Sequence, residues 1–537
     1  MRRRLYYGGP ILTMDQAHPR VEAVLTEGGR IAAVGAYETV AAMAEDAESV
    51  DLQGRTLMPG FVDGHSHMIS AGLREAHECD LTGCTSFDEI LDRIRRFREE
   101  RDLTHGEVIR SVGYDLAVLK EGVHPTAALL DSLGFDNPIT CIHKSQHMGA
   151  YSTVAMEKAG ITDETYVCPP GGSVGRTEEG KLNGYFEETA RSLLAEKYDR
   201  NYTKEEIEEA VLVGQEQYLR YGYTTVQEGG SSRLRWDAIS KVADEQRLKL
   251  DVVFYPTADS EMPWWKRTKD SRGGGYQNHL KIGGVKTFLD GSPQVRTAWM
   301  LEPYEGEKEY RGYPSKTDEE LEQTLSDALD LDMQVLAHCN GSAASEQFIS
   351  CWERVTARKN KGEGARPVMI HCQTVTYEQL DRMKAIGMMP SFFIGHCYYW
   401  GDIHIRNFGE RGYRISPMKQ ALDRGMVSSM HQDSPVTRPD MLHSIWCAVN
   451  RITSSGVCIG EDNRIDCYDA LIAATNGGAY TYFEEDKKGI LKPDAVADFV
   501  ILDKDPTAVE PMKIKDIKVL ATIKEDEVLY RSPDELG

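Results

Sequence analysis

The sequence predicts an α/β protein: a (β/α)8 TIM barrel with a large insertion after its first strand, and a small β-sandwich domain. The middle of the chain alternates apolar, strand-like runs with amphipathic helical segments, a pattern typical of βα units and a parallel sheet. Eight such runs can be counted, which is the number that this barrel requires. The eight runs are Leu57–Phe61, Thr224–Gln227, Leu250–Tyr255, Ile282–Phe288, Gln334–Ala337, Val368–Ile370, Met388–Phe393 and Met426–Ser429.

The two ends of the chain carry short strand patterns separated by turns, unlike the middle. Examples are Arg20–Thr26, Ile31–Val34, Ala497–Leu502 and Lys518–Ile523. Because both ends share this character, we expect them to form one composite β-sandwich domain. Its predicted limits are residues 1–57 and 485–537, with the barrel over residues 58–484.

The stretch between the first and second predicted strands is far longer than a βα loop. It must therefore hold structure of its own. Residues near 86–100 and 204–221 have helical patterns, and Cys168–Gly172 reads as a loop. We expect residues 75–215 to form an inserted lid or subdomain over the mouth of the barrel.

Composition excludes several classes of partner. The formal net charge is -23, from 85 acidic and 62 basic residues, so neither nucleic acid nor an anionic membrane surface would attract the chain. The N-terminus has no apolar segment of a signal peptide, and no apolar run has membrane-spanning length. The 11 cysteines are scattered without CxxC pairs, as expected for reduced thiols in a cytoplasmic enzyme.

A His-Ser-His triplet ends the first strand-like run, in the segment Leu57-Met58-Pro59-Gly60-Phe61-Val62-Asp63-Gly64-His65-Ser66-His67. Residues i and i+2 of a strand point to the same side, so His65 and His67 can offer two imidazoles to one point. Same-facing histidines at a strand end suit a metal site at a barrel mouth. Alone, the triplet more often represents two ordinary surface histidines.

Further polar side chains lie on, or just after, four of the later strands. They are Lys286, His338, His371 and Asp433. Each has a simpler explanation, because a lone strand-end histidine is usually hydrogen-bonded structure and a strand-end aspartate often caps the next helix. Their joint occurrence at successive strand ends favours a metal site instead. Imidazole and carboxylate ligands suit zinc and neighbouring divalent metals.

These motifs together resemble the metal-dependent amidohydrolase superfamily. The resemblance is greatest to amidohydrolase family 3, the branch of YtcJ-like and N-substituted formamide deformylase-like proteins, and it covers nearly the whole chain. The segments that carry it are Pro59–His67, Val285–Ser292, Gly489–Pro493 and Ala497–Asp503.

The resemblance implies a binuclear metal site. His65, His67 and Asp433 would hold the more buried metal, and His338 and His371 the more exposed one. The metals would be two zinc ions, with manganese, iron or cobalt also compatible with these ligands. Lys286 would be carboxylated by CO₂ and bridge the metals as an anionic carbamate. Lys281 is the nearby competitor, but Lys286 matches the branch motif.

The inserted region contributes one candidate site residue, His147. It stands in Ser145-Gln146-His147, where the branch usually has Asp-Gly-His, so this sequence keeps only the histidine. His147 is expected either to bind a substrate carbonyl and steady the oxyanion or to pack within the lid.

Other candidate substrate-binding residues follow later strands. His396, Tyr399 and Trp400 come after the seventh run, where they could line the pocket. Arg296, downstream of Gly291-Ser292, could pair with a substrate carboxylate. His431 is expected either to be a structural residue or to support the metal ligands from behind.

The predicted reaction is hydrolysis of a C–N bond in a small-molecule amide, N-acyl, formamide or carbamate substrate. A metal-bridged hydroxide would attack the carbonyl, with Asp433 as the general base and then the general acid. The alternatives are an ester or lactone hydrolase and a mononuclear deaminase, with Asn340 and Gln373 compatible with either metal count. A non-catalytic regulatory or binding protein is the alternative of another class. The resemblance also suggests a homodimer.

Overall fold

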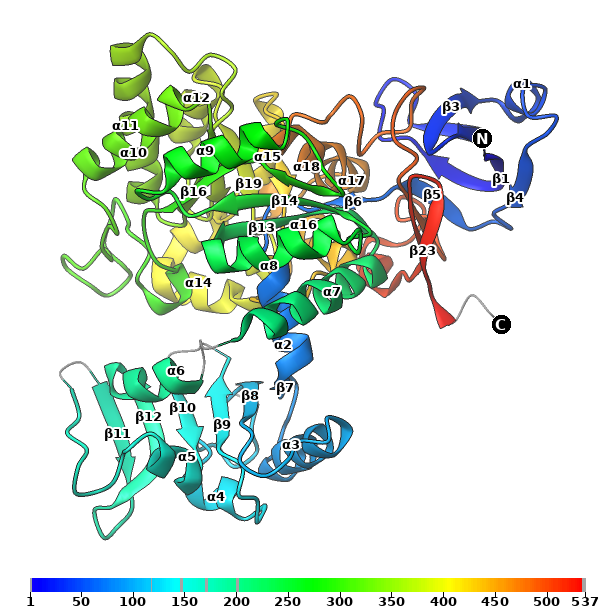
Figure 1. The fold of residues 1–537 in the computed structure, drawn as a ribbon. Coiled ribbons are helices and arrows are strands. Elements are labelled where there is room, and N and C mark those ends of the chain that lie inside the picture. The colour runs from blue at the N-terminus through cyan, green and yellow to red at the C-terminus, as the bar shows by residue number, and fades with distance from the viewer. Residues whose placement is uncertain (1, 117, 145–147, 170–171, 199–201, 534–537) are drawn as a thin grey trace. The chain divides into compact units, whose positions relative to one another are not determined.

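The computed structural model describes residues 2–116, 118–144, 148–169, 172–198 and 202–533. The chain divides into two compact units. Residues 1–70 and 214–537 form the first unit, and residues 71–213 form the second. Both units mix α-helices and β-strands (Figure 1).

Both ends of the chain contribute to one eight-stranded sheet in the first unit. Its strand order is β23-β22-β21-β5-β1-β2-β3, with β4 paired to β1. The antiparallel pairing of β5 with β21 joins the two ends. The strands are β1 Arg3–Leu12, β2 Arg20–Glu27, β3 Arg30–Gly35, β4 Glu48–Asp51, β5 Thr56–Pro59, β21 Phe499–Leu502, β22 Val519–Lys524 and β23 Glu527–Arg531. That this sheet forms a separate β-sandwich domain stays a prediction.

Two parallel sheets make up the remaining strands of the first unit. A four-stranded sheet has the order β15-β14-β13-β6, and a five-stranded sheet has the order β16-β17-β18-β19-β20. A parallel bridge between Thr257 and Lys286 links them. The strands are β6 Phe61–Val62, β13 Tyr223–Ser231, β14 Asp251–Pro256, β15 Leu280–Ile282, β16 Gly284–Phe288, β17 Gln334–Cys339, β18 Val368–His371, β19 Met389–Phe392 and β20 Ser429–Met430. The ladders of the described residues do not close into a ring, so the closed TIM barrel stays a prediction.

Two of the predicted strands are each divided by a glycine. The run Leu57–Phe61 is divided between two sheets: β5 ends at Pro59 in the eight-stranded sheet, and β6 begins at Phe61 in the four-stranded sheet. A Cβ on Gly60, between them, would lie 2.4 Å from a methyl carbon of Thr224. The run Ile282–Phe288 is likewise divided at Gly283, where a Cβ would lie 2.3 Å from the ring of Tyr255. The backbone therefore passes so close to the Thr224 and Tyr255 side chains that glycine is required at both points where the chain changes sheet.

Helices connect the parallel strands, as parallel neighbours require crossover connections. Their ends follow ordinary capping rules: α10 begins after Thr317, which forms a capping box with Glu320. The longer helices and the short helices near the site are α8 Arg233–Asp244, α9 Met262–Ser271, α10 Asp318–Asp330, α11 Ser342–Lys359, α12 Tyr377–Ala385, α13 His396–Tyr399, α14 Gly401–Phe408, α15 Met418–Asp423, α16 Met441–Asn450, α17 Cys467–Ala474 and α18 Asn476–Thr481. Helix α1, Tyr37–Ala41, follows β3.

The second unit contains a six-stranded sheet of order β11-β12-β10-β9-β8-β7. Its strands are β7 Glu78–Asp80, β8 Ile109–Tyr114, β9 Ile139–His143, β10 Met148–Tyr151, β11 Gly172–Arg176 and β12 Leu182–Glu188. Its helices are α3 Phe87–Glu100, α4 Ala127–Asp131, α5 Thr153–Lys158 and α6 Ser192–Tyr198. Helices α2, Met68–His77, and α7, Lys204–Arg220, run across the two boundaries between the units.

The predicted helical segment near 86–100 is confirmed by α3. Ser86 caps this helix by accepting a hydrogen bond from the Glu89 N–H, and Ile90 and Ile94 are buried one turn apart. No helix in the described parts of the chain combines the length and the apolar character needed to cross a membrane.

Candidate metal centre

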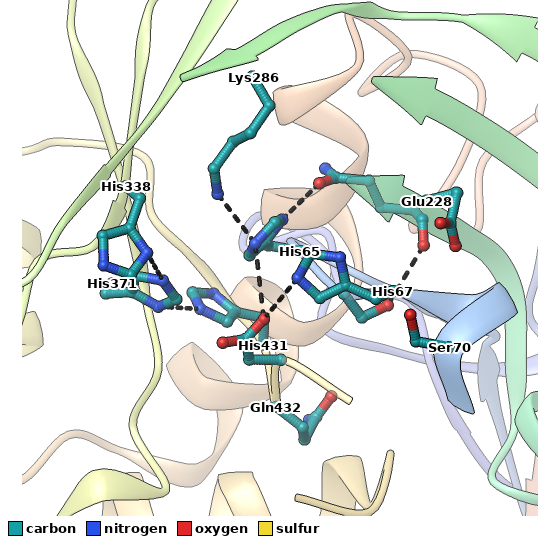
Figure 2. A network of polar contacts seen from close by, with 12 residues as sticks. His65, His67, Ser70, Glu228, Lys286, His338, His371, His431 and Gln432 are labelled. Carbon is teal, nitrogen blue, oxygen red and sulfur yellow. Dashed lines mark hydrogen bonds and ion pairs between the residues drawn. The ribbon is translucent and has the colours of Figure 1, made fainter. Parts of the chain in front are cut away.

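The predicted ligands of the first unit lie at the carboxyl ends of its parallel strands, where catalytic groups of α/β enzymes gather. His65 and His67 follow β6, Lys286 lies on β16, and His338 lies on β17. His371 ends β18, and Asp433 follows β20. Figure 2 shows the Lys286 amine and the rings of these four histidines directed toward a common region.

The first group of ligands consists of His65, His67 and Asp433. Each offers an atom within 4.8 Å of the other two. The Nε2 atom of His67 lies 3.2 Å from Asp433 Oδ1, and the Nε2 atom of His65 lies 3.6 Å from it. The Nζ atom of Lys286 lies 2.9 Å from His65 Nε2. The lysine therefore borders this group directly.

The second group consists of His338 and His371, with His431 behind them. The Nδ1 atom of His338 lies 2.9 Å from His371 Nε2, and the Nδ1 atom of His371 lies 3.1 Å from His431 Nε2. The ring of His431 continues to Ser391, whose Oγ lies 2.9 Å from His431 Nδ1. His431 thus contacts the Nδ1 atom of His371, a predicted ligand, and can hold its ring in place. We refer to His65, His67, Lys286, His338, His371 and Asp433 as the metal-facing cluster.

The donor set of the metal-facing cluster fits a divalent metal. The Oδ1 atom of Asp433 is buried and forms no well-aligned hydrogen bond with the described residues, although His67 Nε2 and His65 Nε2 lie 3.2 and 3.6 Å from it. Burying a carboxylate oxygen without a good hydrogen bond costs free energy, and a bound cation would offset this cost. Imidazole nitrogens and a carboxylate oxygen converging on one point are the ligands of zinc and its neighbours.

The surroundings favour neutral imidazoles at His65 and His338 and a charged carboxylate at Asp433. Burial, followed by the charge of Lys286, lowers the pKa of His338 to about 4 and that of His65 well below its usual value. Burial opposes ionisation of Asp433, but the imidazole of His67 at 3.2 Å, followed by those of His371 and His65, holds its pKa well below the usual range. Burial lowers the pKa of Lys286 to about 7, although Asp433 opposes the shift. Neutral imidazole and carboxylate are the protonation states that bind metals.

Two ligands adopt a strained backbone. The φ angle of His371 is 78° and that of Asp433 is 54°, in the left-handed region that residues other than glycine rarely occupy. Such strain persists where the surrounding structure fixes it, and it is concentrated at functional sites.

Lys281, the alternative to Lys286 as the lysine of the metal site, instead forms an ion pair with Glu484.

The predicted substrate residues occupy different surroundings. The ring centroid of His396 lies 4.5 Å from that of Trp400 and 4.6 Å from that of Phe393. The ring centroid of Phe393 in turn lies 6.3 Å from that of His371. His396 and Trp400 are thus connected to the metal-facing cluster through Phe393. Tyr399 is 39% exposed beside Trp400.

Arg296 contacts residues outside the metal-facing cluster. The guanidinium of Arg296 donates to Asn407 Oδ1 at 3.0 Å and pairs with Glu307 at 3.3 Å. These contacts give the positive charge of Arg296, in the loop after β16, an acceptor and an acidic partner. His147 lies outside the described residues, so its part in the site stays a prediction.

Sequence reasoning missed two buried side chains that contact predicted ligands. Gln227, at the carboxyl end of the second predicted strand, places Oε1 2.5 Å from His65 Nδ1. Asp290 lies 3.6 Å from His338 Nε2 and accepts backbone N–H groups of Trp299 and Asn340, each at 3.0 Å. Burial raises the pKa of Asp290 to about 7. Their positions at strand ends were the available signal.

Comparison with known proteins gives concordant results. The model of the amidohydrolase family matches residues 48–530. The chain is 26% identical to the N-substituted formamide deformylase of Arthrobacter pascens, covering 99% of this chain and 98% of that protein. It is 28% identical to the protein LONG AFTER FAR-RED 3 of Arabidopsis thaliana, covering 98% of this chain and 91% of that protein.

A solved structure shares the fold. The crystal structure of an uncharacterized metal-dependent hydrolase from Pyrococcus horikoshii OT3 matches with a TM-score of 0.77 and 25% sequence identity. The match covers 95% of this chain and 99% of that one. Since the family model spans most of the sequence, the chain belongs to the amidohydrolase family.

Proposed function

We propose that this protein is a metal-dependent hydrolase that cleaves a C–N bond of a small amide, N-acyl, formamide or carbamate substrate. The observation that carries the proposal is the convergence of the His65 and His67 imidazoles on the buried carboxylate oxygen of Asp433, in a group of three ligand atoms that could hold a metal. The family match and the similarity to an N-substituted formamide deformylase support the same reaction class. The closed TIM barrel of this family is part of the proposal.

The proposed centre holds two divalent ions. His65, His67 and Asp433 would hold one ion, and His338 and His371 the other, with zinc as the first choice of metal. When bound, the ions would supply a water molecule that ionises near neutral pH and would polarise the scissile carbonyl.

Asp433 would move the proton during hydrolysis. Its carboxylate is ionised and faces the two histidines that follow β6, so it can accept a proton from the attacking water. It would then deliver this proton to the leaving nitrogen as the C–N bond breaks. The products would be a carboxylic acid and an amine.

Lys286 would join the two groups of ligands as a carbamate. Its uncharged amine nitrogen would form a bond to the carbon of CO₂ and release one proton to solvent, leaving an anionic carboxylate on Nζ. Its complete burial beside His65, and the low pKa that burial gives it, support this modification. An anionic carbamate is a better neighbour for bound cations than an ammonium group.

Substrate recognition is proposed to involve His396 and Trp400, with Arg296 for a substrate carboxylate and His147 for the carbonyl. Residues 71–213 form a compact unit of their own, and we propose that this unit acts as the lid. The proposal also includes a homodimer in the cytoplasm.

The proposed function is tested by hydrolysis of a panel of N-acyl, formamide, carbamate, ester and lactone substrates. The metal-free protein and the protein reconstituted with zinc and bicarbonate are compared. We expect C–N cleavage by the reconstituted protein and none by the metal-free protein. Turnover that survives complete metal removal would contradict the proposal.

A mononuclear deaminase is the second candidate. It is favoured by one observation: among the described residues, the histidines, cysteines and acidic residues form a single group of three or more ligands, His65, His67 and Asp433. A deaminase would release ammonia from an aromatic amine and would retain activity in Lys286→Ala. The binuclear enzyme would lose its second metal in that variant.

A further inference from the structure

A chain of buried polar groups lies behind His65, on the side of its ring away from Asp433. It runs from the backbone carbonyl of Asp63 through Tyr482 and Gln227 to His65. The Tyr482 hydroxyl lies 2.5 Å from the Asp63 carbonyl oxygen, and Gln227 Nε2 lies 3.0 Å from that hydroxyl. The Gln227 Oε1 atom lies 2.5 Å from His65 Nδ1. All of these side chains are buried.

The direction of every hydrogen bond in this chain follows from its first member. A carbonyl oxygen only accepts, so the single hydroxyl hydrogen of Tyr482 is donated to Asp63. Toward Gln227 the tyrosine oxygen can then only accept, which requires the Nε2 end of the amide to face it. Nε2 also faces the carbonyl oxygen of Gly64 at 3.4 Å.

The amide orientation in turn decides the protonation of His65. Because Gln227 Oε1 is an acceptor, the Nδ1 atom of His65 must carry the hydrogen. In a neutral imidazole the Nε2 atom then holds the lone pair. This is the nitrogen that faces Asp433 Oδ1 and Lys286 Nζ.

We propose that Gln227, with its amide oriented by Tyr482, is a positioning residue that fixes the His65 tautomer for metal binding. The inference rests on the proposed metal centre and adds to it a determinant that the ligand set alone does not contain. The far nitrogen of a metal-bound histidine commonly donates to such a partner, and loss of the partner lowers metal affinity about 10–100-fold.

The other ligands show why this chain is distinctive. His338 Nε2 faces the Gly291 carbonyl oxygen, an acceptor, at 3.1 Å and the Asn340 amide nitrogen, a donor, at 3.0 Å, so these contacts do not impose one tautomer. His371 contacts His431, and that chain ends at the hydroxyl of Ser391. A hydroxyl both donates and accepts, so it does not impose a direction. Of these two chains of hydrogen-bonded side chains, the one through His431 ends on a hydroxyl, whereas the one through Gln227 ends on a backbone carbonyl.

The test uses three variants of the full-length protein: Gln227→Leu, Gln227→Glu and Tyr482→Phe. Co²⁺ affinity is measured by chelator competition, and the visible absorption of bound Co²⁺ reports its coordination. We expect Gln227→Leu to lower Co²⁺ affinity about 10–100-fold and to alter the spectrum. Gln227→Glu keeps an acceptor for Nδ1–H and should restore the affinity. Tyr482→Phe frees the amide to turn and should have a smaller effect than Gln227→Leu.

Gln334→Leu and Tyr255→Phe are matched controls. The buried Tyr255 hydroxyl donates to Gln334 Oε1 at 2.7 Å, so this second tyrosine–glutamine pair makes the same kind of contact without touching a predicted ligand. These variants should lower the melting temperature of the metal-free protein comparably while leaving Co²⁺ affinity unchanged. Equal Co²⁺ affinity in wild-type protein and Gln227→Leu would overturn the inference.

A measurement on the metal-free protein separates this inference from the proposed function. Histidine ¹⁵N chemical shifts distinguish the two neutral tautomers. We expect the Nδ1–H tautomer at His65 in the wild-type protein and a mixture in Gln227→Leu. A wild-type protein with this tautomer that binds no metal would contradict the proposed function alone. The opposite tautomer at His65 would overturn the inference even if metal binds.

Discussion

Two buried clusters of charged and titratable side chains in the first unit are completed in different ways. The metal-facing cluster at the carboxyl ends of the strands leaves Asp433 Oδ1 beside two imidazoles, without a well-aligned hydrogen bond. The paired-charge cluster, near the first residue of β14, contains Asp251, Glu484, Asp498, Lys281, Lys488 and Lys524. Its three acids and three lysines neutralise one another within the chain.

Distances show how complete the second cluster is. Lys488 Nζ lies 2.6 Å from Asp251 and 3.0 Å from Glu484, and Lys524 Nζ lies 2.9 Å from both Asp251 and Asp498. Burial of charge is tolerated only where each ion is paired and hydrogen-bonded. The paired-charge cluster meets this condition without a ligand, whereas the metal-facing cluster requires a cation from outside. The paired-charge cluster is therefore expected to control stability, and the metal-facing cluster to control function.

The largest expected effect is that of Asp433→Asn. The amide can neither carry the proton nor supply an anionic ligand, so activity should fall by at least about 10²–10⁴-fold. Steady-state kinetics of the reconstituted protein measure this loss, and elemental analysis reports the metal. If the variant retains wild-type kcat/KM, Asp433 does not carry the reaction.

Asp251→Asn breaks the paired-charge cluster at its centre. Removing one partner of a buried ion pair leaves an uncompensated charge, so the free energy of unfolding should fall by about 3–5 kcal/mol. Urea denaturation measures this loss, and the folded variant should bind as much metal per chain as wild type. Loss of metal from the folded variant would show that the two clusters are not independent.

The pH dependence of stability should also identify the paired-charge cluster. Burial opposes ionisation of Asp251, but Lys488 and Lys524, with His279 at 2.8 Å, hold its pKa well below the usual value. For a depressed carboxyl pKa, the contribution is complete above the unfolded value of about 3.9 and is lost as the pH falls through the folded value.

The stability difference between wild type and Asp251→Asn should therefore be constant near neutral pH and shrink below about pH 4. Urea midpoints measured across the acid range give this difference. A gap that widens on acidification would mean that Asp251 is not held as a carboxylate by its lysines.

A smaller effect is expected for Gly229→Ala, beside the metal-facing cluster. The added Cβ would lie 2.6 Å from His65 Cε1 and 2.8 Å from Gln227 Oε1, so the imidazole must shift. We expect about a tenfold loss of metal affinity and a stability loss of about 1–3 kcal/mol. Gly275→Ala is the control, because its Cβ would meet no atom within 4 Å. Equal metal affinity in both variants would show that the His65 ring tolerates displacement.

The sequence predicted the metal-facing cluster better than the paired-charge cluster, for a physical reason. His65 and His67 are two residues apart on one segment, so strand geometry alone places them together. Asp251, Lys488 and Lys524 are far apart in sequence and carry no local pattern. Gln227 was missed because a glutamine at a strand end is indistinguishable from a solvent-facing residue until Tyr482 and His65 are seen beside it.

Most strand positions were predicted closely, but the run Met426–Ser429 shares only Ser429 with β20, and the changes of sheet were not predicted. The run Leu57–Phe61 has a uniform apolar pattern, yet it passes from one sheet to another at Gly60. The reason lies in the contact with Thr224, which belongs to a strand distant in sequence. Periodicity reports which residues are buried, but not against which neighbour.

Metal content per chain tests the central claim most directly. Protein purified without chelator is analysed for metal, together with Lys286→Ala and Asp251→Asn. We expect about two equivalents in wild type and in Asp251→Asn, and fewer in Lys286→Ala. Wild-type protein that holds no metal, even after reconstitution with zinc and bicarbonate, would contradict it.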